Sequence, residues 1–260
     1  MAKQRAKRAN RANPRVERND PAYKNSRSNG RDNVIELNFA KKPKKQKIEI
    51  IPRNLNQEEL LIALEDPTKN IVFATGPAGC GKTLIATLHA IKALKEGTVE
   101  KIVITRPNVA VDDKDIGYLP GDILKKMTPW MMPILDVFSE YYTQDHIKYM
   151  LEENIIEMVP IAFIRGRTFK NAYILIDEAQ GTTVNSMLSI LTRIGEGSKM
   201  VVTGDVAQSD RGKDNGLADF IVRFKDTSSR IALIQFKKQD VERHPVVKEI
   251  LDIYKDYEVK

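Results

Sequence analysis

One stretch of eight residues constrains the fold of this chain more than any other. It follows the spacing Gly-x-x-x-x-Gly-Lys-Thr of a Walker A phosphate loop and reads Gly76-Pro77-Ala78-Gly79-Cys80-Gly81-Lys82-Thr83. The apolar residues 71–74 before it are typical of a buried strand, and the Ala-, Leu- and Ile-rich residues 84–94 after it are typical of a helix. Strand, glycine-rich turn and helix are the context that the motif requires. The alternative is a glycine-rich turn that only packs a helix against a strand.

The motif predicts a site for ATP and Mg²⁺. Glycines let backbone N–H groups converge on an anion, because no Cβ blocks the approach, and the helix that follows points its positive end at the same anion. We expect Lys82 to reach the β- and γ-phosphates and Thr83 to place its hydroxyl on Mg²⁺. Leu84 completes the nucleotide-binding set that we expect around the loop.

A second motif supplies two acids. Residues 174–178 read Ile-Leu-Ile-Asp-Glu, an apolar strand that ends in carboxylates, as in a Walker B motif. Open parallel sheets bind ligands at the carboxyl ends of their strands. We expect Asp177 to hold the Mg²⁺ that Thr83 also binds, and Glu178 to orient and deprotonate the attacking water.

Two amides follow strands near the same predicted edge. Gln180 lies just beyond the acids, and Gln208 follows a fifth apolar strand and the sequence Thr203-Gly204-Asp205. A glutamine that donates to the γ-phosphate loses this contact on hydrolysis, so either side chain is a candidate sensor of the bound nucleotide. The alternative for Gln180 is a structural link between loops.

The rest of the chain is organised as an α/β domain behind a basic tail. Continuous apolar strands separated by helical stretches predict a mostly parallel sheet with helices on both faces. We expect a helix at 56–65 and strands at 71–74, 102–105, 155–159, 173–176, 199–203 and 231–234. Residues 34–39 alternate like a short strand, and the proline-containing segment 112–150 looks like an insertion of short helices and loops. We place the domain at 48–260 and the tail at 1–47.

Charge separates these two parts of the chain. Residues 1–47 hold fifteen Lys and Arg against four acids, a net charge of +11, whereas the whole chain carries +7 and residues 48–260 therefore carry −4. The first 32 residues have almost no large apolar side chains, so we expect them to be disordered. The tail predicts non-specific affinity for nucleic acid, and a solubilising or partner-binding role is the alternative. A single cysteine and the lack of any bilayer-length apolar run or apolar leader favour a cytoplasmic protein without a membrane partner.

Eight short blocks, in order, make the chain resemble the PhoH family over about residues 50–250. The blocks are Gly76–Thr83, Thr105–Pro107, Leu119–Asp122, Ile164–Thr168, Asp177–Gln180, Leu191–Gly195, Thr203–Asp205 and Arg243–Pro245. The family resembles the first RecA-like domain of superfamily 1 helicases, and its members are implicated as ATPases that act on RNA. Its usual loop threonine is Cys80 here, at a position that contributes mainly backbone.

The resemblance implies roles for residues outside the two Walker motifs. Gln57 stands where related helicases keep a glutamine that reads adenine, with a solvated helix residue as the alternative. Arg106 stands at a position that touches the nucleic-acid backbone, and Arg165 and Arg167 have family roles in phosphate or partner contact. A second RecA-like lobe, which often supplies an arginine to the phosphates, has no room in this chain. Arg193 and Arg243 are the candidates to act in trans, although surface ion pairs are the alternative for each.

These observations predict a single RecA-like P-loop NTPase domain that binds and hydrolyses ATP with Mg²⁺. We expect a helicase-like ATPase that acts on RNA or single-stranded DNA and assembles head to tail, for example as a hexameric ring. An ATP-switched binding module with slow hydrolysis is the main alternative. A small-molecule kinase is less favoured, because a kinase has no use for a water-activating glutamate beside the Mg²⁺ ligand.

Overall fold

The sheet of this domain has six strands, all parallel. The computed structural model describes residues 47–107, 120–209, 212, 214–225, 228–242 and 245–253. The strands are β1 (Ile71–Thr75), β2 (Lys101–Thr105), β3 (Ile156–Met158), β4 (Ala172–Ile176), β5 (Lys199–Gly204) and β6 (Ile231–Gln235), in the order β3-β2-β4-β5-β1-β6. The predicted α/β fold with a RecA-like parallel sheet is confirmed, and each of these strands differs from its predicted range by one residue at most at either end. Residues 1–46, which include all of the predicted tail except its last residue and also the predicted strand at 34–39, lie outside the described residues.

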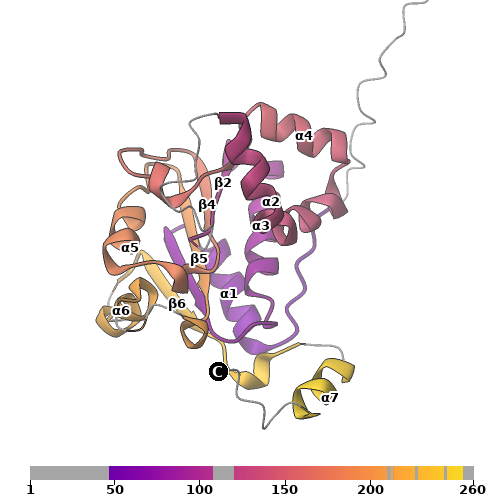
Figure 1. The fold of residues 1–260 in the computed structure, drawn as a ribbon, viewed down its shortest axis with the longest axis vertical. Helices are drawn as coiled ribbons and strands as arrows, with labels where there is room; N and C mark the ends of the chain where they lie inside the picture. The colour runs from indigo at the N-terminus through magenta and orange to yellow at the C-terminus, as the bar shows by residue number, and fades with distance from the viewer. Residues whose placement is uncertain are drawn as a thin grey trace, which may run out of the picture. The chain divides into compact units, whose positions relative to one another are not determined.

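Helices cover both faces of the sheet (Figure 1). The helices are α1 (Leu55–Glu65), α2 (Lys82–Glu96), α3 (Pro120–Tyr141), α4 (Gln144–Glu152), α5 (Val184–Leu191), α6 (Gly216–Arg223) and α7 (Pro245–Ile253). One hydrophobic core lies between the sheet and α1, α2, α3 and α4, and a second lies between the sheet and α5 and α6. None of the helices in the described ranges is both long and apolar enough to cross a bilayer.

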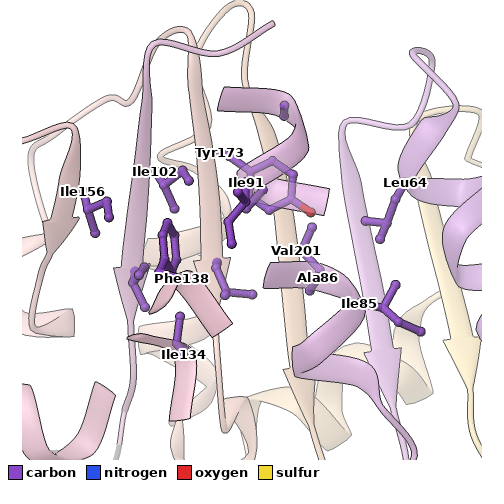
Figure 2. Close-up of a cluster of buried hydrophobic side chains, with 14 of the residues drawn as sticks. Leu64, Ile85, Ala86, Ile91, Ile102, Ile134, Phe138, Ile156, Tyr173 and Val201 are labelled. Carbon is purple, nitrogen blue, oxygen red and sulfur yellow. The ribbon is translucent and has the colours of Figure 1, made fainter. Parts of the chain in front are cut away.

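Alternation along each strand explains why the strands are apolar throughout. On β4, Tyr173 and Leu175 enter the first core, whereas Ile174 and Ile176 enter the second. Successive side chains of a strand point to opposite faces, so a strand covered on both faces has no position for a solvated side chain. Figure 2 shows part of the first core, where Tyr173 lies beside Ile91 of α2.

The predicted run of short helices in the insertion is wrong for residues 120–141. These residues form the single 22-residue helix α3, with Pro129 and Pro133 inside it. Each internal proline costs a helix roughly 3 kcal/mol. Four fully buried side chains on α3 offset this cost, because burying each contributes about 1.5–3 kcal/mol; they are Met127, Met131, Ile134 and Phe138. Residues 112–119 of the predicted insertion lie outside the described residues.

A buried histidine makes the stability of the domain sensitive to pH. His89 on α2 lies 3.3 Å from the Tyr173 hydroxyl, and burial lowers its pKa to about 4, with Lys199 and Lys92 lowering it further and Glu65 opposing them. An unfolded histidine takes up its proton near pH 6.5, whereas the folded His89 stays neutral to lower pH. The contribution of neutral His89 to the free energy of unfolding is therefore complete above pH 6.5 and is lost as the pH falls toward 4.

We expect the free energy of unfolding to fall by about 2 kcal/mol more between pH 7 and pH 5 in the wild type than in His89→Gln. Urea titrations at both pH values measure the difference. The same substitution at the half-buried His146 on α4 is the control and should keep the wild-type difference. Equal pH dependence in the wild type and His89→Gln would contradict the prediction.

Candidate active site

The register of the sheet brings the two Walker motifs together. Thr75 at the end of β1 is level with Gly204 at the end of β5, and Thr105 at the end of β2 is level with Ile176 at the end of β4. The residues that follow these four strands therefore meet at one edge of the sheet. A cavity of about 190 Å³ lies there. Its lining consists of Ala78, Gly79, Gly81, Lys82, Thr83, Leu84, Asp177, Glu178, Gly204, Asp205 and Gln208.

The phosphate loop, residues 76–83, has the backbone that its glycines allow. Gly76 has φ +133°, and a Cβ there would come within 2.3 Å of the Phe236 carbonyl oxygen. Gly81 has φ +79°, and a Cβ there would meet the amide nitrogen of Gln57 at 2.9 Å. Side chains at either position would therefore push the loop away from the segments that support it.

Two segments distant in sequence support this loop. Gln57, on α1, is buried; its amide donates to the Cys80 carbonyl at 3.1 Å and accepts from the Arg53 N–H at 2.8 Å. We call residues 236–242, which follow β6, the loop brace: the Phe236 N–H donates to the Thr75 carbonyl and the Glu242 N–H to the Gly79 carbonyl. The solvated alternative for Gln57 is wrong. Its reading of adenine remains a prediction.

Lys82 and the metal-binding candidates lie inside the cavity. The Lys82 ammonium donates to the carbonyls of Gly76 at 2.7 Å and Pro77 at 2.6 Å. Burial lowers its pKa, and the nearby Cys80 and carboxylates oppose this effect. The Thr83 hydroxyl donates to Asp177 Oδ1 at 2.8 Å. Lys82 therefore already has its ammonium at the loop where the phosphates are expected.

The oxygen ligands at this point fit Mg²⁺. Thr83 and Asp177 present a hydroxyl and a carboxylate to one another, and the Thr203 hydroxyl donates to the same Asp177 oxygen at 2.7 Å. Mg²⁺ binds hard oxygen ligands and commonly uses only one or two protein groups, with phosphate oxygens and water completing its octahedron. Among the described residues there is no cluster of three or more His, Cys, Asp and Glu side chains that would suit another metal.

Glu178 has a strained backbone and a carboxylate held from two sides. Its φ of 56° is in the left-handed region, which is uncommon for a non-glycine residue and recurs at functional sites. Arg106 donates to its Oε1 at 3.1 Å, and the Gln180 amide donates to its Oε2. Because a carboxylate has about four acceptor positions, the two oxygens keep capacity for a water molecule in the cavity.

The two candidate sensor glutamines differ in their surroundings. Gln180 is 3% exposed, and its Oε1 accepts from the Asp205 N–H at 3.0 Å, so it links the turn after β4 to the end of β5. Gln208 is exposed, lines the cavity and donates to Asp205 Oδ2 at 2.8 Å. The structural link suggested as an alternative for Gln180 is therefore present. Sensing of the γ-phosphate by either residue stays a prediction.

The candidate arginines lie elsewhere. Arg193 follows α5, and its guanidinium bonds the Ser189 carbonyl and the Thr192 hydroxyl. Its own carbonyl accepts from Phe169, just before β4, so Arg193 lies near the opposite edge of the sheet from the phosphate loop. Arg167 forms a two-pronged ion pair with Glu157 on β3. Arg243 lies outside the described residues.

Sequence reasoning missed three contacts of the site. They are the Arg106–Glu178 ion pair, the Thr203–Asp177 hydrogen bond and the loop brace. Two signals were visible: Arg106 and Thr203 both lie at or just beyond the ends of predicted strands. To predict these contacts from the two signals, one also needs the order of the strands in the sheet, because Arg106 and Thr203 reach the acids after β4 only since β2 and β5 are the two neighbours of β4.

Comparisons with known proteins agree with the motifs. The family model described as PhoH-like protein matches residues 49–255. A PhoH-like protein of Bacillus subtilis is 39% identical over 86% of this chain and 69% of its own length, and Protein PhoH of Escherichia coli K12 is 40% identical over 79% of this chain and 58% of its own length. This chain therefore spans little more than half of the Escherichia coli relative.

Solved structures are more distant. A large terminase from a thermophilic bacteriophage, in complex with ADP, is 14% identical over 78% of this chain and 50% of that chain, with a TM-score of 0.45. Pif1 helicase from Candida albicans is 15% identical over 80% of this chain and 44% of that chain, with a TM-score of 0.35. The family match covers most of the chain and includes both Walker motifs, so the chain belongs to the PhoH-like protein family.

Proposed function

We propose that this protein is a Mg²⁺-dependent ATPase. The observation that carries the proposal is the shared cavity, which Lys82 and Thr83 of the phosphate loop line together with Asp177 and Glu178 after β4. Lys82 exchanges its loop carbonyls for the β- and γ-phosphates when ATP binds. Thr83 and Asp177 would hold Mg²⁺, which would supply charge neutralisation at the phosphates.

Glu178 is the proposed general base. Its side chain is 32% exposed and lines the cavity, so a water molecule can reach both it and a bound γ-phosphate. The base accepts the proton of this water as the oxygen attacks phosphorus, and ADP leaves with the electron pair of the broken bond. A glutamate in this position favours hydrolysis over transfer of the phosphoryl group to a small acceptor.

We further propose that RNA or single-stranded DNA stimulates the ATPase. The support is the +11 charge of residues 1–47 and the resemblance of the family to helicases. The alternative, an ATP-switched binding module, predicts slow hydrolysis that nucleic acid does not change. The link from Glu178 through Gln180 to Asp205 suits such a switch, because it joins the base to the end of β5.

Assembly into a head-to-tail oligomer is part of the proposal. None of the described residues that line the cavity is an arginine, and Arg193 lies too far around the sheet to serve its own site. An arginine at the phosphates contributes about 10³-fold or more to turnover in related enzymes. A neighbouring copy that presents Arg193 or Arg243 would supply it, and repetition of that contact closes a ring.

The deciding experiment is phosphate release with and without RNA or single-stranded DNA, combined with measurement of particle size with and without ATP. We expect Mg²⁺-dependent release that rises on adding nucleic acid. Deleting residues 1–47 should weaken RNA binding and flatten its dependence on salt, because fewer counterions are displaced. Substituting uncharged Ser and Gly for the tail's basic residues is the matched control for chain length.

Unchanged RNA affinity and salt dependence after the deletion would reject the role of the tail. Absence of stimulation, with normal ATP binding and slow hydrolysis, would favour the switched binding module.

A further inference from the structure

Arg106, which follows β2, lies behind the proposed base. Its Nη2 donates to Glu178 Oε1 at 3.1 Å, its Nη1 lies 3.9 Å from Asp177 Oδ2, and its side chain is only 19% exposed. Arg106 does not line the cavity, whereas both carboxylates do. The direct route from Arg106 to ATP bound in the cavity therefore runs through these carboxylates.

The backbone fixes this arrangement. β2 and β4 are neighbours, and the Asp177 N–H donates to the Thr105 carbonyl at 3.0 Å. The residues next along each strand, Arg106 and Glu178, are consequently held at the same edge of the sheet. Rigid strand ends are the kind of support that keeps a reacting group in place.

Arg106 also ties this edge to α3. Its Nη1 donates to the Trp130 carbonyl at 2.8 Å, a contact between the end of β2 and the middle of α3. A backbone carbonyl oxygen has two lone pairs, so the Trp130 carbonyl can accept from the guanidinium in addition to a bond within α3. One side chain thus bridges α3 and the base.

The charges explain why Glu178 needs such a partner. Asp177 and Glu178 are adjacent carboxylates, and a third, Asp205, lies on the same cavity. Repulsion among them, and from the phosphates of ATP, pushes the Glu178 side chain outward toward solvent. A guanidinium behind Glu178 opposes this displacement, and the Gln180 amide restrains the other carboxylate oxygen.

We propose that Arg106 is a positioning residue for ATP hydrolysis, which holds the Glu178 carboxylate toward the attacking water and anchors it to α3. The inference rests on the proposed function of Glu178 as the general base. It is separate from any contact of Arg106 with nucleic acid, because the guanidinium is engaged at the base in the protein alone.

The test compares the steady-state kinetics of Arg106→Ala, Arg106→Lys and wild type, in the full chain and without nucleic acid. Arg106→Ala should lower kcat about 10- to 100-fold, the cost of a misplaced reacting group, and leave KM for ATP within about twofold. Arg106→Lys keeps the charge but not the forked guanidinium that reaches both Glu178 and the Trp130 carbonyl. Its kcat should therefore lie between that of wild type and that of Arg106→Ala. Arg223→Ala, which breaks an arginine–carboxylate pair on α6, is the matched control and should keep wild-type kinetics.

A double variant isolates the route of the effect. In the Glu178→Gln background, adding Arg106→Ala or Arg106→Lys should lower the residual single-turnover rate by less than about twofold, because the base through which Arg106 acts is already lost. A loss as large as in the wild-type background would place the action of Arg106 elsewhere and overturn the inference. A wild-type kcat in Arg106→Ala, or a raised KM at unchanged kcat, would also overturn it.

Thermal unfolding of each variant controls for folding. If Arg106→Ala does not fold, Arg106→Lys decides alone, and wild-type kcat in that variant rejects the inference. The proposed function fails separately: no Mg²⁺-dependent turnover in wild type, or none lost in Glu178→Gln, rejects Glu178 as the base whatever Arg106 does.

Discussion

Replacing Glu178 by Gln is expected to leave ATP binding intact and to slow its hydrolysis at least ~100-fold, the scale of a lost general base. The amide has nearly the shape of the carboxylate, and its oxygen can still accept the Arg106 N–H that now lies 3.1 Å from Glu178 Oε1. It cannot take the proton of the attacking water. The cavity therefore keeps its phosphate contacts while the chemical step fails.

Equilibrium titration with ATP and single-turnover phosphate release measure these two effects separately. Glu65→Gln is a matched control, since Glu65 is half-exposed, pairs with Lys92 and lies on α1 away from the cavity. It should keep wild-type values of both. Wild-type-like turnover in Glu178→Gln would refute its role as the base.

Replacing Lys82 by Ala is expected to abolish measurable ATP binding at micromolar protein. Lys82 is 8% exposed and is the one lysine or arginine among the described residues that line the cavity, where Asp177, Glu178 and Asp205 supply negative charge. Without its ammonium the phosphates keep the N–H groups of the loop but face three carboxylates with no side-chain cation from the cavity lining. Lost charge-assisted hydrogen bonds in such a setting weaken affinity by roughly 100-fold or more.

The binding titration that serves for Glu178→Gln measures this loss as well. Lys92→Ala, on the same helix but paired with Glu65, should bind ATP like wild type. Retained affinity in Lys82→Ala would show that the phosphates bind elsewhere.

The Lys82→Ala variant also tests whether the protein assembles into a head-to-tail oligomer. Lys82→Ala subunits keep Arg243, and Arg243→Ala subunits keep the phosphate loop, so a mixture of the two should regain turnover if Arg243 acts on a neighbouring site. Arg193→Ala takes its place if Arg243→Ala hydrolyses normally. A fully active monomer with turnover independent of concentration, or no loss in either arginine variant, would defeat the oligomeric model and favour the slow switch.

The sheet and the two Walker motifs could be predicted because short stretches of contiguous sequence specify both of them. Each strand is a continuous apolar run, since burial on two faces leaves no polar position, and each functional group directly follows one of these runs. The Walker A and Walker B residues then meet because parallel strands end at a common edge. Local pattern and global fold agree at these points.

The remaining features, helix α3 and the partner of Glu178, depend on contacts between segments that are distant in the sequence. Helix α3 was misjudged because its prolines argue against a helix locally, and only packing on α2 and the sheet offsets them. The partner of Glu178 was not foreseen, because Arg106 is 72 residues away in sequence and becomes adjacent only through the order β2-β4. Contacts of this kind follow from topology, which the apolar runs alone do not specify.

The loop brace has a consequence for the timing of synthesis. The phosphate loop ends at Thr83, yet its supports at Phe236 and Glu242 come about 150 residues later in the chain, and so does β6, which pairs with β1. When only the first two hundred residues have left the ribosome, both Walker motifs are present but the loop brace that supports the first of them is not. The nascent protein is therefore expected to gain its nucleotide site late and all at once, so that a prematurely ended chain carries the signature of an ATPase without its binding site.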